Sequence, residues 1–294
     1  VDGPRHAFLW VAGRMTDLGT LGGRASTATA INDAGLVVGA SDTRLRGARH
    51  AFSWRAGTMR DLGTLGGARS RANDVSSSGD VVGWSEMPGS GRAHATLWSG
   101  GRLRDLGTLG GASSIATGIN DRGQVVGISE LAGGEPRLFL WQRGQMIDLG
   151  PRAAPAPECC RGRWWLAPRS VPGINDRGEI IGQRRFKGFV LHGKELTWLP
   201  IGDADYGGPS AINERGLITG SRGRPMNFDA VVWHGTQMTN LPSLPGAWSS
   251  ANGVNDQGQV VGESVYVVVA HEVDAHSTDV ESLWHAGSAR SAEP

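Results

Sequence analysis

The sequence predicts an all-β protein, a six-bladed β-propeller of four-stranded antiparallel blades with a repeat of about 44 residues. Three observations lead to this prediction. A His-Ala-Phe-x-Trp string and its close variants recur at His6, His50 and His94, 44 residues apart. The 46 glycines would interrupt helices, and no segment shows the apolar period of an amphipathic helix. Four-strand units of about 40–50 residues, repeated six times, are typical of propellers.

Each unit is predicted to contain four short strands, A to D in chain order. In the first unit, strand A contains Phe8–Trp10, strand B Arg14–Leu18, strand C Ser26–Asn32 and strand D Leu36–Ser41. A three-residue turn over 11–13 joins A to B, and a loop over 19–25 joins B to C. In the turn from C to D, Gly35 can adopt the left-handed conformation that follows a type I turn.

Weaker copies extend the pattern along the chain, so a single propeller domain over residues 1–294 is predicted. The repeats lie at about 6–49, 50–93, 94–136, 137–186, 187–228 and 229–279. Strand A occurs seven times and the other strands six times, so the surplus strand over 280–285 is expected to help close the ring beside the N-terminus. The alternatives are a β-solenoid, whose repeats are usually shorter, and a two-sheet sandwich, which needs no repeated sequence.

Residues that recur in register are predicted to be structural. The Asn-Asp pairs before strand D are expected to form turns by bonding their own backbone. His6, His50 and His94 are expected to have a structural role as well. The tryptophans of strand A are expected to pack the blades: Trp10, Trp54, Trp98, Trp141, Trp233 and Trp284.

The repeated strings resemble a known bacterial family. His-Ala-Phe-x-Trp, Asp-Leu-Gly-Thr-Leu-Gly-Gly and Ile-Asn-Asp-x-Gly-x-Val-Val-Gly are similar to the HAF-repeat family of β-propeller-like proteins, which is described as an extracellular repeat family. The likeness is strong over residues 1–150 and loose beyond them. It implies a repeat architecture and export, but it implies no chemistry and no functional residues.

Composition and motifs narrow the functions that the chain can have. With 29 basic and 28 acidic residues the net charge is +1, which argues against nucleic-acid binding through a broad basic surface. The longest apolar run, Val265–Ala270, is too short to span a bilayer. Cys159 and Cys160 are adjacent and cannot build a disulfide framework. No nucleotide-binding or metal-binding motif is found, so neither a cofactor nor a metal is expected.

The repeat departs from its pattern mainly in the second half of the chain. Repeat 4 carries twelve additional residues between strands B and C, and the D–A connection shortens in repeat 4 and lengthens in repeat 6. In an up-and-down blade the B–C and D–A loops emerge on one face, and loops on a rigid scaffold often carry function. A functional site is therefore predicted on the B–C/D–A face of repeats 4–6.

The candidate residues of this predicted site fall into three groups. The apolar walls are Trp164, Trp165, Tyr206 and Trp248, the anion or carbonyl donors are Arg184, Arg185, Arg222 and Arg224, and the proton-handling groups are Asp205, His271, Asp274 and His276. Tyr206 and Trp248 take a position that small or polar residues hold in the first three repeats. The alternative interpretation is that the aromatic residues pack their own loops and the charged residues form a solvated rim.

Two functions fit this predicted pocket. The first is a binding module for a small molecule such as a sugar, a polyene, a flat ring or a cation. The second is a cofactor-independent cyclase, isomerase or lyase of bacterial secondary metabolism that uses the same pocket. Either way we expect a monomer with a small-molecule partner and no nucleic-acid or membrane partner. Export follows if the family resemblance holds, and a cytoplasmic location follows if the protein is a biosynthetic enzyme.

Overall fold

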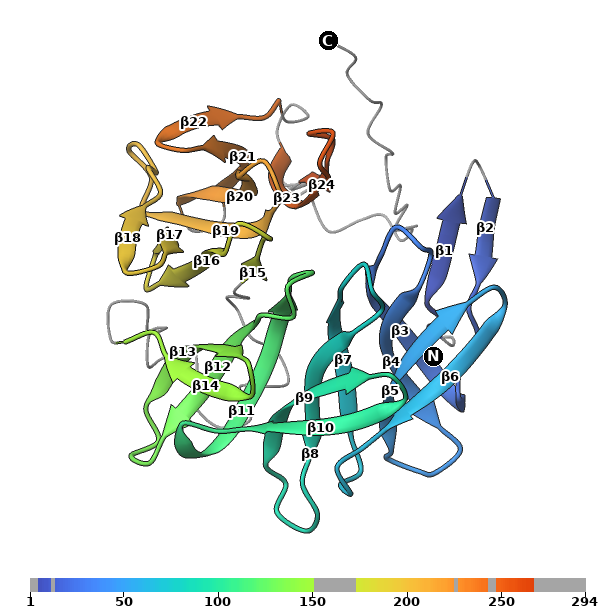
Figure 1. Cartoon of the computed structure of the whole chain (residues 1–294). Helices are drawn as coiled ribbons and strands as arrows, with labels where there is room; N and C mark the ends of the chain where they lie inside the picture. Colours follow the sequence, from blue (N-terminus) through green and yellow to red (C-terminus); the bar gives the residue numbers. More distant parts are fainter. Residues whose placement is uncertain (1–4, 12–13, 151–172, 225–226, 243–246, 267–294) are drawn as a thin grey trace, which may run out of the picture.

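The described part of the chain folds entirely into β-strands, turns and loops. A computed structural model describes residues 5–11, 14–150, 173–224, 227–242 and 247–266 (Figure 1), with the backbone alone at 227, 247–248 and 263–266. The predicted all-β class is confirmed, and the antiparallel four-stranded unit recurs along the chain. Trp164, Trp165, His271, Asp274, His276 and the strand predicted over 280–285 lie outside the described residues.

Five consecutive groups of four strands make up most of the structure. The first sheet contains β3 (Gly22–Ile31), β4 (Val37–Thr43), β5 (Arg49–Arg55) and β6 (Thr58–Gly63). The second contains β7 (Ser70–Val75), β8 (Val81–Glu86), β9 (Ala93–Ser99) and β10 (Arg102–Gly107). The third contains β11 (Gly110–Ile119), β12 (Val125–Leu131), β13 (Pro136–Gln142) and β14 (Gln145–Asp148). Each sheet is an antiparallel meander that takes strands C and D from one repeat and strands A and B from the next.

The fourth and fifth groups are joined into one mixed sheet of eight strands. The fourth group contains β15 (Gly173–Ile174), β16 (Glu179–Arg184), β17 (Lys187–His192) and β18 (Glu195–Trp198), and the fifth contains β19 (Tyr206–Ile212), β20 (Leu217–Arg224), β21 (Asn227–His234) and β22 (Gln237–Asn240). A single parallel pair, Lys187 with Gly207, links them. The first and second sheets show a similar contact as an isolated parallel bridge between Arg49 and Arg69. The parallel pair that makes the eight-stranded sheet mixed is therefore a contact between neighbouring groups, and a similar contact occurs between the first and second sheets.

Two hairpins complete the described structure. β1 (Phe8–Val11) pairs with β2 (Arg14–Asp17), and β23 (Ala247–Val254) pairs with β24 (Val260–Tyr266). In the order of the repeat, these hairpins correspond to strands A and B and to strands C and D of one further blade. The described residues thus contain five four-stranded groups and two hairpins rather than six complete blades.

The C–D turn follows the prediction, whereas the A–B turn differs from it. The C–D turn has the expected form: the Gly35 nitrogen donates to the Asn32 carbonyl at 2.9 Å, and Gly35 has a φ of 72°. The A–B turn of the first sheet has two residues instead of three, Ala56 and Gly57, with φ values of 49° and 85°. Such a two-residue turn with two positive φ angles matches the right-handed twist of the strands that it joins.

The B–C loop is shorter than predicted because strand C begins four residues earlier, at Gly22. The Thr20 hydroxyl donates to the Gly23 carbonyl and the Ser26 hydroxyl donates to the Gly19 carbonyl. Equivalent bonds recur in the second and third repeats, which explains why Asp-Leu-Gly-Thr-Leu-Gly-Gly is repeated. At Gly23 a side chain would collide with the Asp42 backbone, so only glycine fits there.

The repeated histidines pair with the aspartates of strand B. Nδ1 of His6, His50 and His94 lies 2.8–2.9 Å from a carboxylate oxygen of Asp17, Asp61 and Asp105, respectively. The hydrogen bond from His6 is the main cause that lowers the pKa of Asp17. The structural role predicted for these histidines is confirmed, since each pair joins strands A and B of one hairpin.

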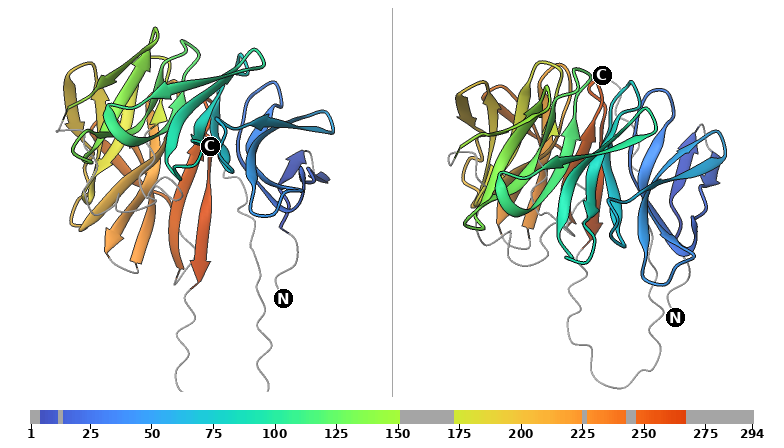
Figure 2. Two further views of the ribbon diagram at one scale, coloured as in Figure 1. Left: turned by 90° about the horizontal axis from the view of Figure 1, so that it is seen from below. Right: turned by 60° about the horizontal axis from the view of Figure 1, so that its bottom comes forward.

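The sheets stand side by side around a common centre in chain order (Figure 2). Apolar clusters fill the spaces between them, and the strand A tryptophans Trp54, Trp98, Trp141 and Trp233 are buried as predicted. Trp10 differs, because it lies on the isolated β1–β2 hairpin and is 59% exposed. The same hairpin exposes Phe8, Val11 and Met15.

The Asn-Asp turns also join neighbouring sheets, which the sequence did not predict. The side chain of Asn120 accepts hydrogen bonds within its own turn, while its Nδ2 donates to the Asn175 carbonyl of the next sheet at 3.0 Å. The Asp121 nitrogen donates to the Asp176 carboxylate at 2.8 Å. Similar bonds connect the following turns up to Asn255 and Asp256. We call this series of bonds the turn latch.

Candidate functional site

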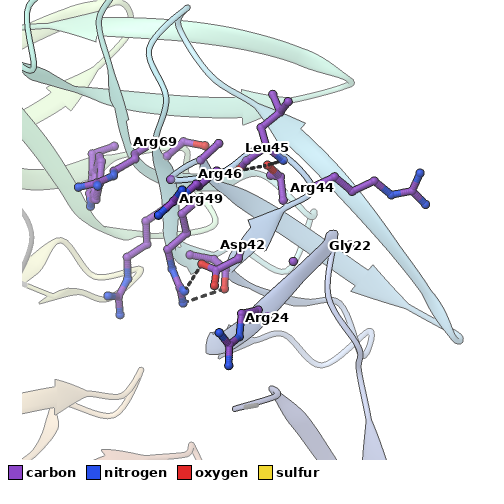
Figure 3. Close-up of a pocket in the computed structure, with 16 residues that line it drawn as sticks. Gly22, Arg24, Asp42, Arg44, Leu45, Arg46, Arg49 and Arg69 are labelled. Atoms are coloured by element: carbon purple, nitrogen blue, oxygen red, sulfur yellow. Dashed lines mark hydrogen bonds and ion pairs between the residues drawn. The ribbon is translucent and has the colours of Figure 1, made fainter. Parts of the chain in front are cut away.

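A pocket of about 650 Å³ lies between the first two sheets, at the end where the B–C and D–A loops emerge. It is lined by the start of β3, the end of β4, the 44–48 loop, the start of β5 and the start of β7 (Figure 3). This is the face on which the sequence predicted a site, but the pocket belongs to repeats 1 and 2. The pocket was not predicted, because these two repeats have ordinary loop lengths.

A small residue in β4 leaves the space for this pocket. Ala40, Trp84 and Ile128 take the same register position in the first, second and third sheets, opposite Thr27, Arg71 and Ile115, respectively. Trp84 and Ile128 are buried in an apolar cluster with Ile115. At the corresponding place in the first sheet, Ala40 has only a methyl group and lines the pocket.

Positive charge dominates the lining. Six arginines line the pocket, Arg24, Arg44, Arg46, Arg49, Arg69 and Arg71, and Asp42 is the one acidic residue of the lining. Arg49 is held by the protein: it donates to the Asp42 carboxylate at 2.8 Å, to the Thr27 hydroxyl at 3.0 Å and to the Ala40 carbonyl at 3.2 Å. Figure 3 shows Asp42 beside Arg49, with the side chain of Arg44 directed away from it.

Two of the remaining arginines are partly buried and lack partners. Arg69 and Arg71 are half-buried, and neither guanidinium makes a hydrogen bond or ion pair to any described residue. The Nε of Arg71 is fully buried without a partner. Burial, and secondly the positive charge of Arg49, lower the pKa of Arg71. A buried donor without a partner is unfavourable. An anion in the pocket would supply the acceptor that this donor lacks.

Of the arginines predicted for the site in repeats 4–6, Arg222 is hydrogen-bonded within the protein and the other three are exposed. Arg222 is tied into its own sheet: it donates to the Asn240 side chain at 3.1 Å and to the Ile201 carbonyl at 3.0 Å. Arg224 is exposed and lies 4.0 Å from the exposed Asp205 carboxylate. Arg184 ends β16, and Arg185 occupies the following tight turn with a φ of 55°. Both side chains are exposed.

The predicted aromatic wall is described only in part. Tyr206 packs edge-on against Phe228, with ring centres 5.4 Å apart, and its hydroxyl donates to the Gln183 side chain at 3.4 Å. Of Trp248 the structure describes the backbone, which pairs with Val265 in β23–β24. With Trp164, Trp165, His271, Asp274 and His276 outside the described residues, the site of repeats 4–6 stays a prediction.

A second, smaller pocket of about 430 Å³ lies at the opposite end of the fourth and fifth groups. Its lining includes Arg177 and Glu179, which form an ion pair at 2.6 Å, and the side chains of His192 and His234. Among the described residues, no group of three His, Cys, Asp or Glu side chains is placed to hold a metal ion. Likewise, none of the described segments is a helix that is long and apolar enough to cross a membrane.

Comparison with known proteins supports the fold and not a particular activity. No protein-family model matches the sequence, and no curated protein matches it either. A protein assigned as TolB from Agrobacterium tumefaciens superposes with a TM-score of 0.52 at 10% identity, over 77% of this chain and 83% of that one. A puromycin-hydrolyzing peptidase from Mycobacterium tuberculosis gives 0.51 at 12%, over 90% of this chain and 48% of that one.

TolB from Acinetobacter baumannii gives a TM-score of 0.49 at 10% identity, with 77% of this chain and 60% of that one covered. The chain thus spans less than two thirds of this TolB and about half of the peptidase. At such identities the likeness concerns the fold alone. Together with the repeated four-stranded antiparallel sheets, the two superpositions above 0.5 identify the chain as a β-propeller-like protein.

Proposed function

We propose that this protein is a binding module that holds a small molecule in the pocket between its first two sheets. The observation that carries the proposal is the pocket itself. Its volume of about 650 Å³ lies within the range of roughly 300–1,000 Å³ that is usual for ligand sites. It also opens where loops of two neighbouring sheets meet, on a scaffold whose strands are fixed by buried tryptophans.

The proposal includes a closed ring of six blades in a single domain, and membership of the HAF-repeat family. The support for six blades is that the two hairpins supply the four strands of one more unit. The family assignment rests on the repeated strings that build the B–C loops and the His–Asp pairs. The aromatic site on repeats 4–6, and its possible use in a cyclase, isomerase or lyase, stay predictions.

The test is to fill the pocket with a side chain that the repeat already uses. Ala40→Trp copies Trp84 at the same register and should occupy the space that a ligand would need. Ligand-observed NMR with a mixture of charged and neutral fragments should detect fragments that bind the wild-type chain. These fragments should not bind Ala40→Trp. Ala34→Trp, in the exposed turn at the far end of the sheet, adds the same group away from the pocket.

The proposal predicts that Ala34→Trp retains every fragment that the wild type binds. If Ala40→Trp folds with a normal circular dichroism spectrum and binds the same fragments as the wild type, the pocket is not the binding site. A variant that fails to fold is replaced by Ala40→Leu, which fills less of the space and should weaken the same fragments.

A further inference from the structure

The lining of the pocket points to the class of its ligand. We propose that it binds a small polyanion with at least two phosphate or carboxylate groups, one held by Arg69 and Arg71 and another by Arg24 and Arg46 at the mouth. This inference rests on the proposed function, since it assigns a ligand class to that same pocket. It does not follow from the overall charge, because the whole chain is nearly neutral.

The first step of the argument is the local excess of charge. The pocket lining carries six arginines and one aspartate, in a chain whose net charge is +1. The Asp42 carboxylate is 2.8 Å from Arg49, so it neutralises an arginine that the sheet already holds in place. The other five arginines of the lining share no carboxylate within it. Like charges gathered in this way repel one another, and a bound anion would relieve the repulsion.

The second step is the state of Arg71. A guanidinium carries five N–H donors, and burial makes each donor without a partner unfavourable. The Nε of Arg71 is one such donor, and the neighbouring charge of Arg49 adds to the cost. The equivalent residue of the third sheet is Ile115, which is buried in an apolar cluster at no such cost. An arginine at this register therefore lowers stability unless an anion occupies the pocket.

The third step concerns the shape of the ligand. The planar fork of arginine matches the paired oxygens of phosphate and carboxylate groups, which form two parallel hydrogen bonds with it. Arg69 and Arg71 are half-buried, whereas Arg24 and Arg46 are exposed at the opening. Two sets of donors at different depths suit a ligand with two separated anionic groups better than a single small anion.

The experiment measures the binding of four probes to the full chain by isothermal titration calorimetry. Inorganic pyrophosphate and citrate carry several anionic groups, while inorganic phosphate and acetate are the matched single-group probes. At low ionic strength, pyrophosphate or citrate should bind at least about tenfold more tightly than its single-group counterpart. Preference between pyrophosphate and citrate distinguishes a phosphate ligand from a carboxylate ligand.

Substitutions connect binding to the proposed residues. Arg71→Ile, which copies Ile115, and Arg69→Gln should each weaken binding of the tighter probe by about tenfold or more. Arg122→Gln removes one positive charge from an exposed turn at the far end of the third sheet and should leave binding unchanged. Arg71→Ile should also raise the melting temperature of the protein without ligand, which a variant that merely damages the fold would not do.

Two results would overturn the inference. One is that no multi-group probe binds more tightly than its single-group counterpart. The other is that Arg122→Gln weakens binding as much as Arg71→Ile, because the attraction would then come from the charge of the whole surface. If fragments without charge bind the wild type and are lost in Ala40→Trp while the anions do not bind, the ligand class is wrong and the proposed function stands. If neither kind of probe responds to Ala40→Trp, both are wrong.

Discussion

At the scale of single residues, the most unusual group outside the pocket is the carboxyl of Asp74 in β7. The same register position holds Ala30, Gly118, Ala211 and Gly253 in other sheets, none of which can ionise. Burial raises the pKa of Asp74 to about 6, although its carboxylate accepts hydrogen bonds from the Ile119 and Val75 nitrogens. The bond from Ile119 joins the second sheet to the third, so the residue combines a useful contact with an unfavourable charge.

This combination predicts a dependence of stability on pH. A carboxyl whose pKa is higher in the folded than in the unfolded state favours folding below about pH 4, and this contribution is lost as the pH rises through 6. Asp74→Asn keeps one oxygen for the Ile119 nitrogen and removes the charge, and it gives up the bond from the Val75 nitrogen. We expect it to raise the free energy of unfolding by up to about 3 kcal/mol at neutral pH and by little at pH 4. Urea unfolding across this pH range measures both.

Asp80→Asn, six residues along the chain, is the control for a general effect of lost negative charge. An increase in stability that is equally large at all pH values, or that Asp80→Asn reproduces, would mean that Asp74 is not the titrating group.

At the scale of elements, the turn latch adds hydrogen bonds to the apolar contacts between neighbouring sheets. The second sheet provides a natural variant, because Ser76 replaces the asparagine of the turn. The Ser76 hydroxyl accepts a hydrogen bond from the Asp80 nitrogen within the turn at 3.1 Å. It has no amide to donate to the Asn120 carbonyl, but the backbone bond of the latch is kept: the Ser77 nitrogen donates to the Asp121 carboxylate at 2.8 Å, and the Ser77 hydroxyl donates to it as well. One side chain therefore separates the two roles of the asparagine, turn formation and contact with the next sheet.

Exchanging the two residues tests the latch. Asn120→Ser should keep the turn and lose the bond to the Asn175 carbonyl, which lowers the free energy of unfolding by about 1–2 kcal/mol. Ser76→Asn should add the missing donor toward the Asn120 carbonyl and raise stability by about 1 kcal/mol. Urea unfolding of the two variants beside the wild type gives both changes. Changes of the same sign in the two variants would contradict this interpretation.

The elements also show what the sequence could predict. The His-Ala-Phe-x-Trp and Asn-Asp strings predicted the strands, the C–D turn and the buried tryptophans, because their local chemistry repeats. The comparison of loop lengths predicted a site on the B–C/D–A face of repeats 4–6, and it did not indicate the pocket that lies on this face in repeats 1 and 2. Ala40 and Arg71 lie in repeats of ordinary length, and their meaning depends on which side chains face each other across neighbouring sheets. That information appears only when the sheets are placed side by side.

At the scale of the whole molecule, two strands and one turn of the described residues lack the partners that their equivalents have in the complete sheets. Among the described residues, β24 pairs only with β23 and β1 pairs only with β2. Asn255 and Asp256 form the last turn of the latch, and no described residue of a following sheet accepts from them, whereas the first turn offers Asn32 and Asp33. Phe8 and Trp10 of β1 are exposed, although the residues at their positions are buried in every complete sheet. All three features would be satisfied if β24 paired with β1.

The register of the other sheets specifies how this closure should occur. The glycine of strand D faces a phenylalanine of strand A in three of them: Gly39 pairs with Phe52, Gly127 with Phe139 and Gly182 with Phe189. The same register places Gly262 opposite Phe8, and Glu263 opposite Ala7. The strand predicted over 280–285 would instead place Ser282 opposite Gly262, at a position that phenylalanine, threonine or valine holds in the other sheets. We therefore expect β1 rather than the 280–285 strand to complete the last blade.

Cysteine cross-linking distinguishes the two strands. In a chain whose Cys159 and Cys160 are replaced by serine, Ala7→Cys with Glu263→Cys should form an intramolecular disulfide on mild oxidation. Because the bond would close a loop of most of the chain, it should raise the free energy of unfolding by roughly 2–4 kcal/mol. Glu281→Cys with Glu263→Cys is the matched pair for the other strand. A disulfide between positions 263 and 281 would show that the strand over 280–285 closes the ring. Disulfide-linked dimers of the Ala7→Cys, Glu263→Cys variant would show that a second copy of the chain supplies the partner for β24.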